Sequence, residues 1–454
     1  MRTLVHGLAI TGASTVSALR RRGHDVVVSD DHHTDTTHDL ANALGVELLH
    51  TPLDLGVFAC QFDLIVPAPG VPETHGLIRA ARTTGVPVVS EIELAYRWEQ
   101  ERPQGPRPIL AVTGTDGKTT TTDMAVAMLR AAGRRADAVG NTDVPFVDAI
   151  DTDLEVFVVE CSSFRLAWTQ QFRSEAAVWL NFAPDHLNWH ESLASYEATK
   201  ARLFDLQRTT DVAIGSIEDD IVMQHLDVAP GRRRTFGLDR GDYRLDGNML
   251  TGPNGPIVDA DAMQRSLPHD ITNALAASAL VMETGLADAD AIGTALTDFV
   301  ARPHRLEVVV SRDGITWYND SKATTPHAAA TAIHAFDSLV LIAGGSRKGV
   351  DLSPMAAEAD RVRAVIAIGE AAPDIRAVFG ASTPVTDAIS MRDAVRMAAA
   401  AARAGDAVVL SPGCASFDWY TGYPARGDDF RRLVHELYSI ADSDDAAASQ
   451  EIHA

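Results

Sequence analysis

The sequence predicts an α/β protein with several parallel sheets, divided into three domains. Short apolar runs alternate with helical stretches along almost the whole chain, which is the pattern of strand–helix–strand units. A length of 454 residues corresponds to about three domains of ordinary size. In the middle of the chain, an apolar run leads directly into a glycine-rich loop and a helical stretch, which is typical of a phosphate-binding domain.

The first domain is expected at residues 1–104 and is predicted to be Rossmann-like. Apolar runs suited to strands lie at residues 3–10, 25–30, 62–70 and 87–94, and an arginine-rich helix ending near Gly23 is expected between the first two. This order predicts a parallel sheet covered by helices. Residues 101–108 contain three prolines and a glycine without a periodic pattern, so we expect a linker there.

The central domain is expected at residues 105–303 and the third at residues 304–440. Apolar runs at 109–114, 154–160 and 176–182 predict a mostly parallel sheet in the central domain, which carries the phosphate loop (P-loop). The third domain repeats the order, with apolar runs at 307–320, 338–349, 363–370 and 406–413, so it is expected to be a second Rossmann-like unit. Residues 441–454 are small, polar and acidic, which predicts a disordered tail.

Charge and cysteine content exclude several classes of protein. A net charge of −23 and a pI near 5.0 argue against nucleic-acid binding, which needs a basic surface. The three cysteines, Cys60, Cys161 and Cys414, are far apart and fit a reduced cytosolic protein rather than a disulfide framework or a cysteine zinc site. Gly7 and Gly12 interrupt the apolar N-terminus, and no later apolar run reaches about 18 residues. We expect a soluble cytoplasmic enzyme without a nucleic-acid or membrane partner.

Lysine is rare in this chain and marks the candidate chemistry. Of the 39 basic residues only four are lysine, namely Lys118, Lys200, Lys322 and Lys348. A lysine ammonium is a compact point charge that fits a phosphate cradle, and its neutral amine can react covalently, whereas arginine is a wide planar fork that stays protonated. We therefore expect functional roles at these positions that arginine cannot fill.

The phosphate loop follows the apolar run that begins at residue 109. The sequence continues as TGTDGKTT, and a helix is expected from near Thr119 to Gly133. In such a loop backbone N–H groups face a phosphate, Lys118 reaches the terminal phosphates and Thr119 can ligate Mg²⁺. Val112 stands where the common G-x-x-x-x-G-K-[ST] motif has its first glycine, so the motif is a shortened one. The predicted nucleotide contacts of the loop are Gly114, Thr115, Asp116, Gly117, Lys118, Thr119 and Thr120.

Candidate Mg²⁺ ligands follow two of the central apolar runs. Glu160 closes the run at 154–160 and offers the hard oxygen ligand that Mg²⁺ needs. Asp185 and His186 follow the next run, and the carboxyl ends of parallel strands meet at one edge of a sheet. Taken singly, Glu160 would be interpreted as a solvated carboxylate, and His186 is as compatible with a structural role as with metal binding. Lys200 lies on an expected helix, and its spacing alone assigns no role.

The chain resembles the Mur ligases, which build the peptide stem of peptidoglycan. Eight motifs over nearly the whole chain carry the resemblance: TGTDGKTT, VVECSSF, APDHLNWH, YEATKARLF, RPHRLE, NDSKAT, LIAGGSRKG and LSPGCASFDWYTGYPARGDDF. NDSKAT and SPGCASFD are similar to the branch of the family that adds D-glutamate. The resemblance implies an ATP-dependent amide ligase that adds D-glutamate to UDP-N-acetylmuramoyl-L-alanine through an acyl phosphate, in peptidoglycan precursor synthesis. Separately, we expect a monomer.

The resemblance also implies the catalytic residues and the metal ligands. Lys118 and Thr119 would hold ATP and its Mg²⁺, and Glu160 and His186 would serve two Mg²⁺ sites. Lys200 would be carbamylated, which turns a cation into an oxygen donor for the second ion. By the same resemblance, Lys118, Lys200, His186 and Glu160 form the catalytic set.

Further contacts with ATP and the substrates follow from the same motifs. Adenine and ribose would be surrounded by Asn273, His304, Arg305 and Asp320, with Lys322 close to the phosphates. The muramoyl substrate would contact Asn141 and Ser162, and its uridine diphosphate would contact Thr11, Asp30, Ala68 and Gly70. The glutamate would be bound by Thr324, Lys348, Ser416 and Tyr423. Lys348 is also compatible with a plain turn lysine.

Three departures from the family pattern keep alternatives open. Thr325 stands where the family motif NDSKATN has its last asparagine, and Asn188 stands where the motif DHLD has its last aspartate. Ala9 stands where the first turn of the family often has glycine. Because Thr325 adjoins the implied glutamate pocket, a related ligase that adds L-glutamate or another amino acid is one alternative. A second alternative is a P-loop nucleotide-binding regulator without ligase activity. A dehydrogenase would need glycine at Ala9, so we expect UDP rather than NAD in the first domain.

Overall fold

The computed structural model describes residues 1–50, 54–187, 189–347, 349 and 351–451 of the chain. The chain forms two compact units, Met1–Phe299 and Val300–Ala454. Parallel strands joined by helices build the main sheets of both units, which confirms the predicted α/β class. The predicted boundary near residue 104 lies inside the first unit, so the division of that unit into two domains stays a prediction.

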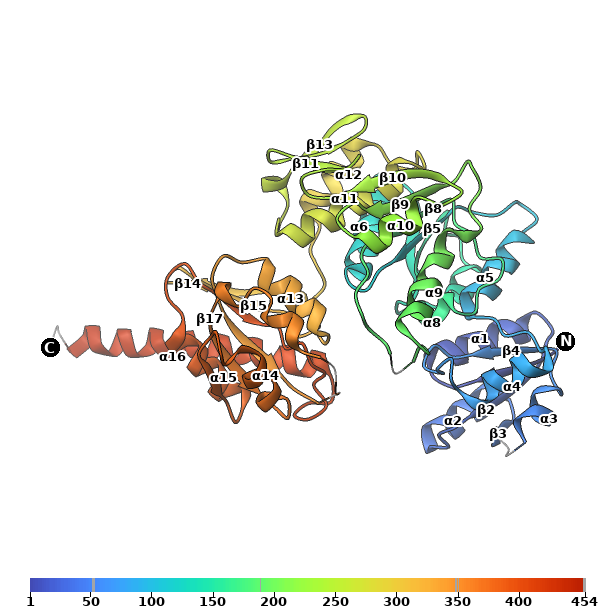
Figure 1. The fold of residues 1–454 in the computed structure, drawn as a ribbon, viewed down its shortest axis with the longest axis horizontal. Coiled ribbons are helices and arrows are strands. Elements are labelled where there is room, and N and C mark those ends of the chain that lie inside the picture. The colour runs from blue at the N-terminus through green and yellow to red at the C-terminus, as the bar shows by residue number, and fades with distance from the viewer. Residues whose placement is uncertain (51–53, 188, 348, 350, 452–454) are drawn as a thin grey trace. The chain divides into compact units, whose positions relative to one another are not determined.

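The first sheet contains four parallel strands in the order β3-β2-β1-β4 (Figure 1). β1 lies between β2 and β4, so its Leu4 and Val5 are buried. Its carboxyl end, together with those of β2 and β4, forms the edge of the sheet at which ligands commonly collect. The elements of this part are β1 (Arg2–His6), α1 (Ile10–Arg21), β2 (Asp25–Asp30), α2 (Asp35–Leu44), β3 (Leu48–His50), α3 (Leu55–Ala59), β4 (Leu64–Pro67) and α4 (Gly76–Thr84).

The apolar run at residues 87–94 is not the strand that its composition predicts. Val88 forms only an isolated bridge with Ile65, and helix α5 (Glu91–Gln100) begins three residues later. Glu91 and Glu93 lie in the first turn of that helix, where acidic side chains interact favourably with the helix dipole. The acidic pair therefore favours a helix start that the apolar pattern alone does not indicate.

The second sheet of the first unit has six parallel strands in the order β10-β9-β8-β5-β7-β6. β5 lies inside this sheet and is buried along its whole length, as expected for a continuous apolar run covered on both faces. The elements are β5 (Ile109–Thr113), α6 (Lys118–Ala131), β6 (Ala136–Gly140), α7 (Phe146–Ala149), β7 (Val156–Glu160), α8 (Ser163–Leu166), β8 (Ala176–Trp179), α9 (Leu193–Asp205), β9 (Val212–Ser216), α10 (Asp220–Leu226) and β10 (Arg232–Phe236).

Two further helices and a small antiparallel sheet complete the first unit. The helices α11 (Pro268–Met282) and α12 (Ala289–Asp298) pack against α6 and form one apolar core with it. The small sheet consists of β11 (Arg244–Asp246), β12 (Met249–Gly252) and β13 (Gly255–Asp259). The predicted helix after the phosphate loop is confirmed, because α6 begins at Lys118 and ends at Ala131.

The second unit contains a mixed sheet rather than a purely parallel one. Its order is β14-β15-β19-β16-β17-β18, and only the β14–β15 pair is antiparallel. Asp313 and Gly314 connect that pair with φ values of 54° and 75°, a conformation that makes Asp-Gly a strong hairpin turn. The elements are β14 (Glu307–Arg312), β15 (Ile315–Asn319), α13 (Pro326–His334), β16 (Leu339–Gly344), β17 (Val362–Ile368), α14 (Ala372–Phe379), β18 (Val385–Asp387), α15 (Met391–Ala401), β19 (Ala407–Leu410) and α16 (Tyr423–Glu451).

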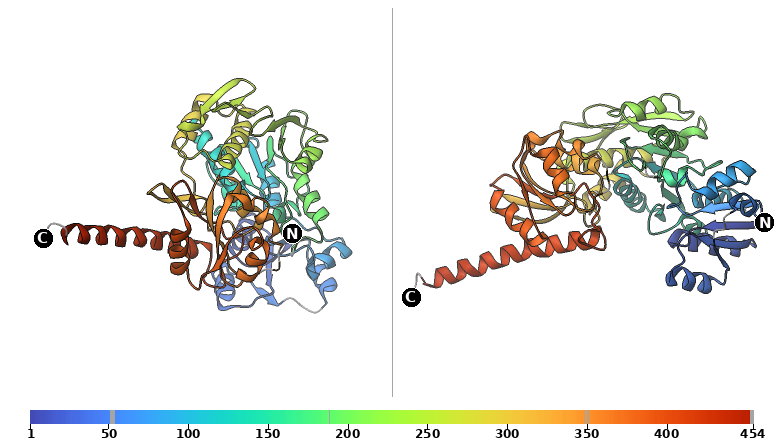
Figure 2. Two further views of the ribbon diagram at one scale, coloured as in Figure 1. Left: turned by 60° about the vertical axis from the view of Figure 1, so that its left-hand side comes forward. Right: turned by 60° about the horizontal axis from the view of Figure 1, so that its bottom comes forward.

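Helix α16 continues into the segment for which composition predicts a disordered tail. Its backbone is helical from Tyr423 to Glu451, and Figure 2 shows it as one continuous helix. The segment includes three consecutive alanines from Ala446, and alanine is the strongest helix former. An argument from polarity alone does not take this propensity into account. Among the described residues, none of the helices has the length and apolar content needed to cross a bilayer.

The linker between the two sheets of the first unit is fixed by a buried ion pair. Arg107 donates to both carboxylate oxygens of Glu99, at 2.9 and 2.7 Å, and to the carbonyls of Ile150, Thr152 and Leu154. Both side chains are almost fully buried. The guanidinium also lies 4.4 Å from the centre of the Phe157 ring. α5 is therefore held against the central sheet although it precedes the linker.

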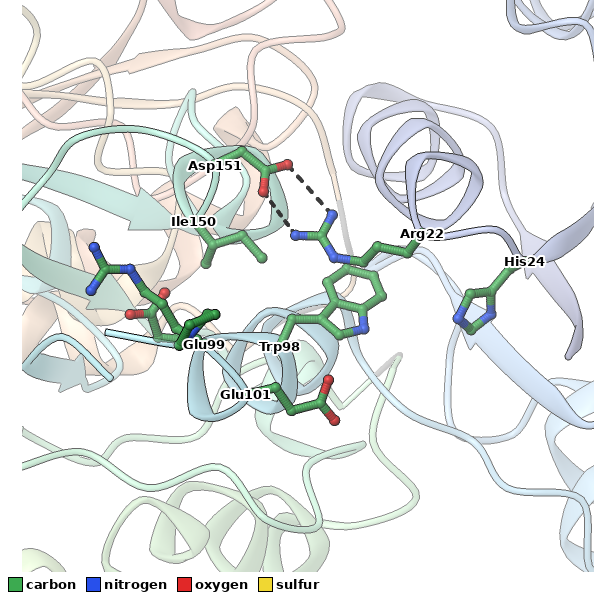
Figure 3. Close-up of a pocket in the computed structure, with 9 residues that line it drawn as sticks. Arg22, His24, Trp98, Glu99, Glu101, Ile150 and Asp151 are labelled. Carbon is green, nitrogen blue, oxygen red and sulfur yellow. Dashed lines mark hydrogen bonds and ion pairs between the residues drawn. The ribbon is translucent and has the colours of Figure 1, made fainter. Parts of the chain in front are cut away.

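A surface cavity of about 530 Å³ lies beside this linker (Figure 3). Arg22, at the end of α1, stacks 4.2 Å from the Trp98 ring of α5 and donates to Asp151 at 2.8 Å. The cavity thus lies where the first sheet's helices meet α5 and the loop after α7. Its lining includes none of the predicted site residues.

We expect the change Glu99→Ala to lower the free energy of unfolding by about 3–5 kcal/mol, because it leaves the Arg107 charge buried without its partner. Urea unfolding measures the effect. The control is Asp153→Ala, which removes an exposed carboxylate 3.5 Å from Arg135 and should cost less than about 1 kcal/mol. Equal losses for the two variants would contradict the prediction.

Candidate active site

The phosphate loop connects β5 to α6 at the carboxyl edge of the central sheet. Gly117 has a φ of 81°, which a residue with a side chain rarely adopts. A Cβ atom at this position would lie 2.6 Å from Asn273 Oδ1, so the loop also lacks room for one. The first N–H groups of α6 have no partners within the helix and carry its positive dipole end. The local sequence therefore builds an anion-binding turn.

Asn181, which follows β8, fixes the conformation of the loop. Its side-chain oxygen accepts hydrogen bonds from the backbone N–H groups of Thr115 and Asp116, both at 2.9 Å. The Thr115 hydroxyl contacts the Tyr196 hydroxyl at 3.2 Å. Neither Asn181 nor Tyr196 was predicted from the sequence. Asn181 lies at the end of an apolar strand run, and this position at a sheet edge was the available signal.

Two lysine amines meet at the carbonyl oxygen of Gly114. Lys118 Nζ donates to it at 2.9 Å and to the Thr115 carbonyl at 2.7 Å, while Lys200 Nζ donates to Gly114 at 2.6 Å. Lys200 is 1% exposed. Burial, reinforced by the charge of Lys118, holds the pKa of Lys200 well below that of an ordinary lysine. A neutral amine with a free electron pair is therefore favoured at Lys200.

Glu160 presents an oxygen that fits a hard cation. It ends β7 beside β5, is 2% exposed, and receives a 2.8 Å hydrogen bond from Asn141 on Oε1. Its other oxygen, Oε2, is buried and has no hydrogen-bond partner among the described residues. An unpartnered buried carboxylate oxygen is costly unless a cation or donor meets it. Carboxylate and hydroxyl oxygens are the ligands that Mg²⁺ prefers, so Glu160 and the half-buried Thr119 fit this ion.

His186 lies near the lysine pair with an unusual backbone conformation. Its φ is 56°, and its Nε2 atom is 3.1 Å from Asp185 Oδ2. Burial lowers the pKa of His186, with Lys118 and Lys200 adding to the effect and Asp185 opposing it. The Tyr196 ring lies beside both His186, at 6.2 Å between ring centres, and Lys200, whose Nζ is 4.8 Å from the ring centre. A neutral imidazole is the form that binds metals.

The residues predicted to bind uridine diphosphate occupy the edge of the first sheet. Asp30 accepts backbone hydrogen bonds from Leu8 at 2.7 Å and His32 at 2.8 Å. Thr11 receives a 3.1 Å hydrogen bond from Arg165, which also pairs with Glu91. Ala68 is half-buried and Gly70 is exposed. Ser162, predicted for the muramoyl group, has a buried hydroxyl without a partner among the described residues.

Glu73, in the loop between β4 and α4, contacts two side chains near the start of α9. Glu73 Oε2 accepts a 2.7 Å hydrogen bond from Ser195 and lies 3.4 Å from His190 Nδ1. Burial would raise the pKa of Glu73, but the His190 and Ser195 contacts lower it from 4.5 to about 2. This contact therefore stabilises the fold at neutral pH and is lost as the pH falls from 4.5 towards 2. Sequence patterns did not indicate it.

Several of the predicted residues of the second unit have specific contacts within that unit. Asp320 accepts hydrogen bonds from the Leu306 backbone at 3.2 Å and from Ser411 at 2.8 Å. Lys322 Nζ lies 4.0 Å from the centre of the Tyr423 ring, and that ring packs edge-on against His304. Tyr423, predicted for glutamate, is thus beside two residues predicted for the nucleotide.

For the other predicted residues of the second unit, burial describes the surroundings. Ser416 is buried, whereas Arg305 and Thr324 are half-buried. Lys348 lies outside the described residues. Arg426 was not predicted, although it is almost completely buried and donates to Ser321, Cys414 and Ala415. It therefore fixes the loop that carries Ser416.

Comparison with known proteins finds family matches in three parts of the chain. Residues 1–90 match the Mur ligase MurD-like N-terminal domain, residues 112–281 the Mur ligase middle domain, and residues 304–414 the Mur ligase glutamate ligase domain. Among curated proteins, the UDP-N-acetylmuramoylalanine--D-glutamate ligase of Frankia casuarinae is 42% identical over 95% of this chain and 93% of its own. The enzyme of that name from Mycolicibacterium vanbaalenii is 37% identical over 95% and 97%.

Solved structures show the same fold at much lower sequence identity. The UDP-N-acetylmuramate-alanine ligase of Thermotoga maritima is 19% identical, with a TM-score of 0.58 over 97% of this chain and 100% of its own. A pseudomurein peptide ligase type C from Methanothermus fervidus is 17% identical, with a TM-score of 0.60 over 96% and 99%. Both likenesses concern the arrangement of strands and helices.

We expect Gly117→Ala to weaken ATP binding at least about tenfold, because alanine strains the backbone at this φ and its Cβ collides with Asn273. Titration with a fluorescent ATP analogue measures the affinity. Gly133→Ala is a matched control at the other end of α6, with a φ of 77° and open space around the added Cβ. Because of the backbone strain, this control variant should have a lower free energy of unfolding, but it should bind ATP normally. Equal ATP affinities for the two variants would contradict the role of the loop.

Proposed function

The chain belongs to the Mur ligase family, and we propose that it joins D-glutamate to UDP-N-acetylmuramoyl-L-alanine with ATP, in the synthesis of a peptidoglycan precursor. The observation that carries the proposal is the likeness along almost the entire chain to several ligases of this specificity, with identities from 32% to 42%. The matched glutamate ligase domain and the phosphate loop support the same activity.

The reaction needs two displacements. A carboxylate oxygen of the acceptor attacks the γ-phosphorus of ATP, the bond to the β-phosphate oxygen breaks, and ADP leaves. The glutamate amine then attacks the acyl carbon, the bond to the phosphate oxygen breaks, and the nitrogen loses its extra proton. Phosphoryl transfer of this kind depends chiefly on positioning and on stabilising charge. In this chain Lys118 and the first N–H groups of α6 would face the phosphates.

We propose that Lys200 acts as a carbamate. A neutral amine attacks CO₂, an N–C bond forms, and one proton is released, so the side chain becomes an anion with two oxygens. The depressed pKa of Lys200 supplies that neutral amine. When bound, two Mg²⁺ ions would neutralise phosphate charge, and their ligands would come from Thr119, Glu160, His186 and the Lys200 carbamate. The unpartnered Oε2 atom of Glu160 supports this assignment.

The glutamate site is proposed on the second unit. Thr324, Lys348, Ser416 and Tyr423 would bind the amino acid, and Asn273, His304, Arg305, Asp320 and Lys322 would bind the nucleotide. A dicarboxylate needs a cation and several hydroxyl donors, which these residues provide. Arg426 supports the assignment of Ser416, because it holds the backbone carbonyls of Cys414 and Ala415 just before it. We further propose that the protein acts as a monomer in the cytoplasm, where ATP and its nucleotide-linked acceptor are present.

The direct test is phosphate release from ATP and Mg²⁺ with UDP-N-acetylmuramoyl-L-alanine, comparing D-glutamate, L-glutamate and no amino acid. We expect release only with D-glutamate, and a product whose mass equals acceptor plus glutamate minus water. Release only with L-glutamate would retain the mechanism and change the specificity. No release with either amino acid, while ATP still binds, would favour a non-catalytic nucleotide-binding protein.

We expect Lys200→Arg to fold but to lose phosphate release by at least about a hundredfold, because arginine cannot form the carbamate. Lys200→Ala should recover part of the activity when small carboxylates such as acetate are added. Circular dichroism checks the fold, and Arg202→Lys on the same helix is the control, with activity expected to remain. Full activity in Lys200→Arg would rule out the carbamate.

A further inference from the structure

Two histidines and an aspartate converge at the carboxyl edge of the first sheet. His6 ends β1, Asp31 follows β2 directly, and His75 precedes α4. Asp31 Oδ2 lies 2.9 Å from His75 Nε2 and 3.7 Å from His6 Nε2, and the centres of the two rings are 4.8 Å apart. One ring nitrogen of each histidine and the carboxylate oxygen all lie within 4.8 Å of one another.

We propose that His6, Asp31 and His75 bind a divalent transition-metal ion, with Zn²⁺ as the preferred occupant. Two imidazole nitrogens and one carboxylate oxygen are a common ligand set for Zn²⁺, with bonds of about 2.0–2.2 Å. A tetrahedral site with such bonds places its ligand atoms about 3.3 Å apart. The two contacts of Asp31, at 2.9 and 3.7 Å, lie on either side of that value, and the three ligand atoms lie within 4.8 Å of one another, so the side chains would have to move closer together to complete the site. Mg²⁺ and Ca²⁺ prefer oxygen ligands and fit this set poorly.

The surroundings of His6 are those of a metal ligand. Its Nδ1 atom is hydrogen-bonded to Ser29 Oγ at 2.9 Å, and its ring is 1% exposed. If Nδ1 carries the proton and donates to Ser29, Nε2 presents its electron pair towards Asp31. Histidine ligands usually donate their second N–H group in this way, which fixes the ring.

His75 and Asp31 complete the set from the more exposed side. The 2.9 Å contact between His75 Nε2 and Asp31 can be an ordinary hydrogen bond, in which case a metal ion would replace the shared proton. The other nitrogen of His75, Nδ1, accepts a 3.3 Å hydrogen bond from the backbone N–H of Leu77 at the start of α4, and the change of tautomer that a metal ion at Nε2 requires would break this long contact. Asp31 is 44% exposed in its side chain, which gives an ion a route into the site.

Three protein ligands leave one coordination position open. Zn²⁺ sites of this kind hold water or an anionic oxygen there, in contrast to closed structural sites with four protein ligands. Asp30, predicted for uridine diphosphate, directly precedes Asp31 in the chain. The open position would therefore lie beside the proposed uridine diphosphate site, and this placement rests on the proposed function. The site lies on the first sheet, whereas the lysine pair lies on the central sheet.

The test uses the full-length protein after treatment with a chelator, without ATP or acceptor. Calorimetric titration with ZnCl₂ should give one tight site, and Co²⁺ should produce visible absorption bands that Zn²⁺ abolishes. His75→Gln and Asp31→Asn should each weaken Zn²⁺ binding at least about tenfold. Circular dichroism checks that the variants fold, and His75 and Asp31 are preferred to His6 because they are less buried.

Two controls separate this site from other histidines. His33 and His50 stack with ring centres 3.7 Å apart elsewhere in the same domain, and His50→Gln should leave Zn²⁺ affinity unchanged. Glu160→Gln tests for binding at the central site and should also leave it unchanged. Absence of Zn²⁺ binding, or equal affinity in His75→Gln, Asp31→Asn and the unaltered protein, would overturn the proposal. Because no ligase substrate is present, neither result bears on the proposed ligase activity.

Discussion

The candidate active site depends on one backbone carbonyl, that of Gly114, which accepts hydrogen bonds from the amines of Lys118 and Lys200. Two positive charges at one oxygen repel each other, and burial makes the repulsion stronger because water cannot screen it. Lys200 is the fully buried partner, so its neutral form is favoured. The glycine-rich turn that positions this carbonyl therefore brings the two amines together at the start of α6.

Local sequence patterns predict some parts of the candidate site. A strand, a glycine-rich loop and a helix in succession are enough to locate Lys118 and Thr119, and a carboxylate at a strand end is enough to locate Glu160. Asn181 and Tyr196 could not be found in this way, because their roles arise from contacts across the sheet to Thr115. The antiparallel pair in the sheet of the second unit, by contrast, has a local sequence signal, because the Asp313–Gly314 turn predicts a hairpin.

Arginine and lysine have separate tasks in this protein. Arg107 and Arg426 are buried and hold several backbone carbonyls each, which suits a planar group with five donors. Burial lowers the pKa of Arg426 to about 10, so it stays charged at neutral pH. These two buried arginines therefore hold backbone segments in place inside the protein. Two of the three described lysines, Lys118 and Lys200, converge at the phosphate loop, where both amines donate to the Gly114 carbonyl.

The Glu99–Arg107 pair also determines where this chain could be divided. Glu99 belongs to α5, before the proline-rich linker, whereas Arg107 lies near the end of the linker and donates to carbonyls of the segment between α7 and β7. A fragment that began at residue 105 would retain the guanidinium and lose its counter-ion. Ile92 and Tyr96 of α5 also share an apolar core with Phe157 and Phe172. By its contacts α5 is part of the central sheet's structure, so a self-contained central fragment would have to start near Ser90.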